Sequence, residues 1–132
     1  MVYSFWHKIL FIGTGLFLIA TPSLAISLTD TNPVHPGNWY AAAGMIGLAS
    51  PVESDAMALG KQVDIHTEVG GDVLSAGGQV RVAGTVAGNV RILGGEVEIS
   101  GTVGRNVTVV GGTVILSPTS HVFGHVLVAG GT

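Results

Sequence analysis

Residues 71–87 read GDVLSAGGQVRVAGTVA, and residues 88–104 read GNVRILGGEVEISGTVG. The two segments align without a gap, and each carries a glycine doublet at the same place. The doublet returns at residues 111–112. A motif that recurs every 17 residues is an internal repeat, and repeats of this length indicate a solenoid or an array of stacked units.

The 17-residue period runs through most of the chain. Its apolar columns are Val52, Val69, Val86 and Val103; Val63, Val80, Val97 and Val114; and Ile65, Val82, Ile99 and Leu116. In this alignment the coils begin at residues 37, 54, 71, 88, 105 and 124. The last interval is 19 residues long, which places two inserted residues near positions 118–121.

Each coil contains short runs in which Val or Ile alternates with other residues, and glycines separate the runs. This pattern is typical of short strands joined by turns. In the third coil Val73 and Ser75 share one side, Val80 and Val82 share one side, and Val86 stands alone. Strands this short need neighbours, and stacking of successive coils provides one about 4.8 Å away.

The predicted fold is therefore all-β, a single-stranded right-handed parallel β-helix (β-solenoid) over residues 37–132. It has about 17 residues per coil and about 5.5 coils, with β-branched side chains filling the interior. The glycine doublets are expected at tight corners, where glycine tolerates a positive φ.

Composition limits the possible classes of function. The 132 residues include no cysteine, charged residues make up 10%, and the net charge is −3. A chain that is 47% hydrophobic is not intrinsically disordered. The lack of cysteine excludes disulfides and thiolate chemistry, and the acidic balance argues against nucleic-acid binding.

The N-terminal residues are typical of an export signal. Lys8 precedes an apolar run at 9–20, and Ser23 and Ala25 predict cleavage after Ala25. The expected division is a signal peptide (1–25) forming a signal helix, a linker (26–36) and the β-helix (37–132). An uncleaved membrane anchor and a buried core segment are the alternatives. The expected location is outside the cytoplasm, in the periplasm or at the cell envelope.

Several phrases of the repeat resemble the bactofilin, or polymer-forming cytoskeletal, family: GDV at 71–73, GG at 77–78, VRVAGTV at 80–86, GNV at 88–90 and ISGTV at 99–103. The resemblance covers about residues 37–132. It implies a right-handed β-helix that polymerises end to end without a nucleotide and acts as a scaffold, not a catalyst. The export-like N-terminus is similar to that of the exported, envelope-associated relatives.

One column of mostly short polar residues recurs near the start of each coil. It comprises Asn38, Asp55, Asp72, Asn89 and Asn106, with His125 in the last coil. Such a column is compatible with a calcium-binding or sugar-binding edge. We favour a corner ladder, because Asn and Asp bond nearby backbone groups and calcium needs a denser set of oxygens.

The remaining polar residues do not form a catalytic pattern. Asp64, Arg81 and Glu98 share an outward column, which favours a surface charge ladder over a glycosidase pair. His121 and His125 lack the helical spacing of a zinc protease motif, and the glycine doublets precede strands, unlike a phosphate loop. We therefore predict no catalytic residue, no metal ligand, no cofactor and no nucleotide site.

The outward positions of the first strand in each coil form an apolar stripe, which a soluble monomer rarely leaves bare. This outer apolar stripe comprises Tyr40, Met57, Leu59, Leu74, Leu93, Val110 and Leu127. It is expected to pack on another rod, on a membrane surface or on the N-terminal segment. Scattered surface apolarity without a partner is the alternative.

The ends of a β-helix expose strand edges, and we expect the last coil, which reaches Thr132, to be left open. The predicted assembly contacts are Val122, Val126 and Val128 at one end, and Trp39 and Ile46 at the other. We expect a non-enzymatic, polymer-forming scaffold of the cell envelope whose main partner is itself, with the membrane surface or envelope components as further partners. The alternatives are an exported binding module, such as an adhesin or envelope-glycan binder, and the truncated β-helix of a larger membrane protein.

Overall fold

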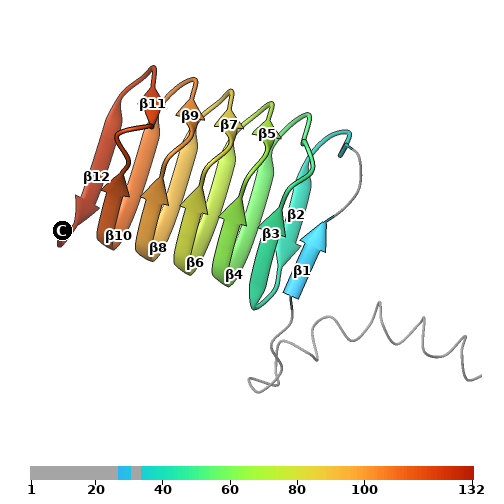
Figure 1. The fold of residues 1–132 in the computed structure, drawn as a ribbon, viewed down its shortest axis with the longest axis horizontal. Coiled ribbons are helices and arrows are strands. Elements are labelled where there is room, and N and C mark those ends of the chain that lie inside the picture. The colour runs from blue at the N-terminus through green and yellow to red at the C-terminus, as the bar shows by residue number, and fades with distance from the viewer. Residues whose placement is uncertain (1–26, 31–33) are drawn as a thin grey trace, which may run out of the picture.

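The computed structural model describes residues 27–30 and 34–132, so the predicted signal segment 1–25 lies outside it. The described chain is all-β. Its parallel strands form a solenoid of about six turns with roughly 17 residues each, and the turns follow one another along a rod (Figure 1). The predicted parallel β-solenoid is confirmed.

Four coils each contribute one long and one short strand. The long strands are β4 (Ala56–Ile65), β6 (Val73–Val82), β8 (Val90–Ile99) and β10 (Val107–Leu116). The short strands are β5 (Glu68–Val69), β7 (Thr85–Val86), β9 (Thr102–Val103) and β11 (His121–Val122). The first coil instead has β2 (Trp39–Ala42) and β3 (Met45–Leu48), while β1 (Ser27–Asp30) and β12 (Val126–Gly130) lie at the two ends.

The first half of each long strand stacks in line with β2 and forms the first face of the rod, and the second half stacks in line with β3 and forms the second face. The short strands form the third face. The glycine doublets lie inside the long strands, between the halves that form the first and second faces. A Cβ atom on Gly77 would meet the carbonyl oxygen of Gly60 in the neighbouring coil. Close approach of stacked backbones therefore requires these glycines. The expected positive φ is wrong, because Gly37 is the only described residue with a positive φ.

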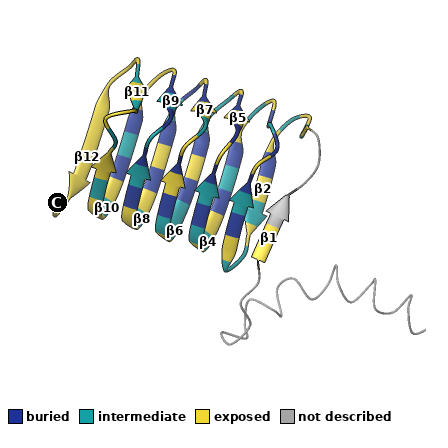
Figure 2. Cartoon of the chain, in the orientation of Figure 1, coloured by how far each residue is buried: buried dark blue, intermediate teal, exposed yellow. Residues whose placement is uncertain are grey.

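Columns of valine and isoleucine fill the interior as predicted (Figure 2). Val63, Val80 and Val97 stack in register and are fully buried. The column of Trp39 continues with Ala56, whose small side chain limits crowding beside the indole. Ser75 is a polar member of the interior, and its hydroxyl donates a hydrogen bond to the carbonyl of Ala58 (3.1 Å).

The two inserted residues form a turn between β10 and β11, which confirms the predicted insertion. The backbone N–H and the hydroxyl of Ser120 both donate to the carbonyl of Ser117, at 2.9 and 2.7 Å. The Thr119 hydroxyl donates to the carbonyl of Ser100 in the coil below (3.2 Å). These bonds allow the chain to return to register after the longer corner.

Each end of the rod carries a partial coil. At one end β1 pairs in parallel with β3, and His35 bridges to Val52. At the other end β12 pairs with the first half of β10. Strand β1 lies within the predicted linker (26–36). Its residues carry no glycine doublet that would mark them in the sequence as part of the repeat.

Candidate assembly surfaces

A ladder of hydrogen bonds joins the column of polar residues near the start of each coil. The side-chain oxygen of each member accepts a hydrogen bond from the backbone N–H of the member one coil further on. The donor and acceptor pairs are Asp55 to Asn38 (3.1 Å), Asp72 to Asp55 (2.7 Å), Asn89 to Asp72 (2.7 Å), Asn106 to Asn89 (3.2 Å) and His125 to Asn106 (2.9 Å). The predicted corner ladder is confirmed, and it satisfies backbone groups between the strands.

Asp72 is a charged rung of this ladder. Its carboxylate also accepts a hydrogen bond from the Asn89 side-chain amide (3.2 Å), and its Oδ2 lies 3.9 Å from Nη1 of Arg91. The hydrogen bond from the Asn89 backbone lowers the pKa of Asp72 below its ordinary value of 3.8. Slight burial opposes this shift, while the Asn89 amide and the charges of Arg91 and Arg105 reinforce it. The folded rod thus favours the ionised carboxylate.

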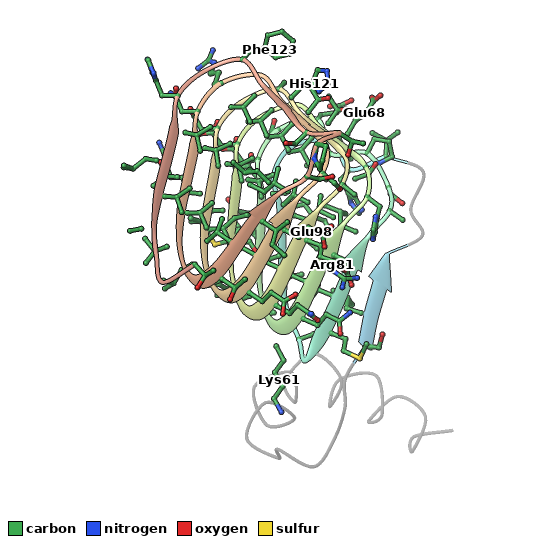
Figure 3. All side chains as sticks on the ribbon, turned by 60° about the vertical axis from the view of Figure 1, so that its left-hand side comes forward. Lys61, Glu68, Arg81, Glu98, His121 and Phe123 are labelled. Carbon is green, nitrogen blue, oxygen red and sulfur yellow. The ribbon has the colours of Figure 1, made fainter. Side chains whose placement is uncertain are left out.

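The predicted charge column lies on the outside of the second face, where Arg81 and Glu98 point toward one another (Figure 3). Nε of Arg81 lies 3.5 Å from Oε2 of Glu98, and both side chains are exposed. Asp64 is in register with Arg81 but accepts a hydrogen bond from Gln62 (2.9 Å). Because exposed ion pairs contribute little free energy, this column adds little to the stability of the rod.

The C-terminal end of the rod exposes side chains that the preceding coil buries. Val126 and Val128 continue the columns of Val107 and Val109. Val107 and Val109 are fully buried, whereas Val126 and Val128 are 44% and 42% exposed. Figure 2 shows the change along the rod, from buried strands in the middle to the exposed β12.

The same end exposes further apolar groups. Leu116 continues the column of the buried Ile99 but is exposed, and Val122 is half-buried. Phe123 is 76% exposed and projects from the rim of the last corner (Figure 3). We define the C-terminal end surface as Leu116, Val122, Val126 and Val128. Val122, Val126 and Val128 are the assembly contacts predicted from the sequence, and Leu116 and Phe123 are additional exposed apolar residues at this end.

At the N-terminal end the predicted contact residues are already buried within one chain. Trp39 is 7% exposed and Ile46 is 2% exposed, and both belong to the core. Strand β1 pairs over β3 and places Leu28 next to Ile46. Both side chains are thus largely covered within one chain, and their contact with a partner stays a prediction. Within the described residues, no strand occupies the outer edges of β1 and β2, and these edges form the N-terminal end.

The outer apolar stripe follows two neighbouring columns on the first face. Tyr40, Met57, Leu74 and Leu127 lie in one column, and Leu59, Leu93 and Val110 lie in the other. All of them are exposed except the half-buried Met57. Arg91 interrupts the first column, and its ion pair with Asp72 draws it toward the ladder. The structure thus brings the predicted stripe residues together on one surface.

Ser120, His121, Val122 and Phe123 line an open pocket at the last corner of the described chain. Nδ1 of His121 lies 3.2 Å from the carbonyl oxygen of Thr119. In residues 27–30 and 34–132 no three His, Asp or Glu side chains are arranged to hold a metal ion. The same described segments contain no helix with the length and apolarity to cross a membrane.

The fold defines the chain as a β-solenoid with an apolar C-terminal end and an apolar lateral stripe. Comparison with known proteins finds no matching protein-family model, no matching curated protein and no matching solved structure.

Proposed function

We propose that the chain is a non-enzymatic, polymer-forming structural scaffold that assembles through the ends of a right-handed β-helix. The C-terminal end surface carries the proposal. Its members lie in columns whose other members form the core, yet Val126 and Val128 remain about as exposed as surface residues. Stacking of a second copy would bury these side chains and extend both the core and the sheets.

Two physical effects favour such stacking. Burial of apolar surface contributes about 25 cal/mol per Å² removed from water. In addition, the outer edge of β12 presents backbone donors and acceptors that another strand satisfies by pairing in the manner of β-augmentation. Pairing between copies would repeat the parallel contacts that already hold each coil to the next.

The test is assembly of the full chain, measured by electron microscopy and analytical ultracentrifugation. The variant Val126→Lys/Val128→Lys places two charges on the C-terminal end surface and is expected to abolish filaments. The matched control is Thr113→Lys/Ile115→Lys, which adds the same charge to two exposed, outward positions on the second face of the last full coil. Filaments in the double variant, or strictly monomeric rods of the unmodified chain at high concentration, would contradict the proposal.

We also propose that the scaffold works outside the cytoplasm, at the cell envelope, after removal of residues 1–25. The apolar run at 9–20 followed by Ser23 and Ala25 supports this location. Mass spectrometry of the protein recovered from cells is expected to find Ile26 as the first residue. Recovery of an intact N-terminus in the membrane fraction would favour an uncleaved anchor.

The outer apolar stripe supports a second candidate function, an exported binding module that uses the side of the rod. Exposed large apolar side chains in contiguous columns mark interaction surfaces in soluble proteins. Monomeric rods that bind isolated envelope glycans or membranes, with Leu59 and Leu93 required for binding, would favour this function over the scaffold.

A further inference from the structure

The two ends of the rod are stepped in opposite senses (Figure 1). At the C-terminal end, β12 adds a strand to the first face over residues 107–111. Residues 113–116 on the second face have no such strand over them among the described residues. At the N-terminal end, β1 adds a strand to the second face over β3, while no strand of the described residues lies over β2 on the first face. The projection at each end therefore matches the recess at the other.

We propose that copies of this chain stack head to tail and share one composite coil at each junction. In that coil β12 of one copy forms the first face, and β1 and His35 of the next copy form the second and third faces. This inference rests on the proposed function, which states that the ends assemble. It adds the polarity and the register of the junction, and it requires the two unlike ends to meet.

Counting strands shows that the junction closes evenly. On the first face, β12 and the β2 of the next copy lie between β10 and the next β4. On the second face, β1 and β3 of the next copy occupy the same two layers. On the third face, His35 and Val52 of the next copy continue the sheet from β11 toward β5. Each face therefore has two layers between the β10–β11 coil of one copy and the β4–β5 coil of the next, so the stacked ends leave neither a gap nor an extra strand.

Two apolar columns continue through this junction. Val126 lies in the column to which Trp39 of the next copy belongs, and Leu28 of the next copy would follow Val114. Leu28 is exposed in the single chain, so this contact would cover apolar surface from both partners. The carbonyl of Thr132 already accepts a hydrogen bond from the Val114 N–H (2.8 Å). Thr132 of one copy would therefore end next to Leu28 of the following copy, and β1 of that copy would pair with the second face from Leu28 onward. In the same register, Asp30 and His35 of the next copy would follow Leu116 and Val122.

Head-to-tail stacking fixes the repeat along the filament. Five coils begin between residues 37 and 105, and the composite coil adds one more layer. At about 4.8 Å per layer, one copy advances the filament by about 29 Å. Alternation of head-to-head and tail-to-tail junctions would make the repeat contain two copies and roughly double it.

Cysteine cross-linking of the full chain tests the polarity directly, because the natural sequence has no cysteine. Ala42 and Ala129 are exposed and lie at opposite ends of one outward column. Directly paired positions on adjacent strands are within reach of a disulfide, whereas the two ends of one rod are not. The variants are Ala42→Cys, Ala129→Cys and the double variant, with Ala76→Cys in the middle of the column as the control for lateral contact.

The expected result is a series of covalent multimers from the double variant after mild oxidation. A mixture of the two single variants should give only dimers, and each single variant alone should stay monomeric on non-reducing gels. Dimers from Ala42→Cys alone or Ala129→Cys alone would overturn head-to-tail stacking while leaving end-to-end assembly intact. Filaments without cross-links in the double variant would overturn the proposed register, and the absence of both filaments and cross-links would overturn the proposed function as well.

Discussion

Ile99 and Leu116 are in register on adjacent coils, yet Ile99 is fully buried and Leu116 is 40% exposed. The difference arises because β10 covers Ile99, whereas no described strand follows Leu116 on the second face. The same column therefore serves as core in one coil and as surface in the next. The proposed stacking of copies would cover this exposed continuation of the core.

Leu116→Glu is expected to weaken end-to-end assembly strongly, because Asp30 of the next copy would follow this position in the proposed register and two acidic residues on adjacent strands repel one another. The matched control is Ile115→Glu, since Ile115 is similarly exposed (44%) but lies in the outward column of Arg81 and Glu98. Sedimentation velocity of the two variants measures the effect. Equal loss of assembly in both would show that added charge, and not the end surface, controls association.

Gly77→Ala is expected to destabilise the rod by about 3 kcal/mol, since the new methyl group would collide with the carbonyl oxygen of Gly60. Gly47→Ala provides the comparison, because a Cβ at Gly47 meets no atom within 4 Å and the residue has no positive φ. We expect that variant to change the free energy of unfolding by less than about 1 kcal/mol. Chemical denaturation measures both values, and similar losses would show that the close stacking of glycines is unimportant.

Acid is expected to weaken the rod partly through Asp72. Its pKa is lowered in the folded state, chiefly by the Asn89 backbone hydrogen bond, so folding favours the ionised form. This contribution is present above the unfolded value of about 3.8 and is lost as the pH falls through the lower folded value. Asp72→Asn retains a side-chain oxygen for the ladder but cannot titrate.

The free energy of unfolding of the unmodified chain should therefore fall more between about pH 5 and pH 2 than that of Asp72→Asn. Glu68→Gln, which removes an equal charge from an exposed position outside the ladder, is the control. Denaturant titrations at each pH give the comparison. An identical pH dependence for the unmodified chain and Asp72→Asn would show that the ladder carboxylate does not contribute to acid sensitivity.

Periodicity predicted most of the fold because each coil repeats the same local pattern. Val63, Val80 and Val97 share one environment in three successive coils, so their spacing alone places them in the core. The insertion before His121 was equally visible, since a longer corner shifts the register of everything after it. The polar corner ladder followed from residue type and spacing, although its bonds extend to the next coil.

The ends were harder to predict because they are where the repeat stops. Strand β1 pairs with β3 through backbone groups, and backbone pairing leaves no periodic signature over only four residues. Ile46 was expected to face a partner, but β1 lies beside it. Leu116 looks like any other member of its column in the sequence. Leu116 is exposed because no described strand follows it on the second face, and only the arrangement of strands in space shows this.

The outer apolar stripe is expected to hold rods side by side. Leu59 and Leu93 lie two coils apart in one outward column and are both exposed, so one partner surface can contact both. The variant Leu59→Lys/Leu93→Lys should abolish lateral bundles in electron micrographs, because bundling would bring four ammonium groups into an apolar contact. The stripe residues point away from the core, so the variant should unfold at nearly the same denaturant concentration as the unmodified chain.

Gln79→Lys/Thr113→Lys adds the same charge to the polar second face and should leave bundles intact. Flotation with zwitterionic lipid vesicles provides a second measurement, which avoids attraction of the added lysines to anionic lipid. Loss of vesicle binding with bundles preserved would assign the stripe to a membrane surface. Unchanged bundling and unchanged vesicle binding in Leu59→Lys/Leu93→Lys would show that the stripe is not a contact surface, because two charges at its centre cannot be accommodated in a closely packed apolar interface.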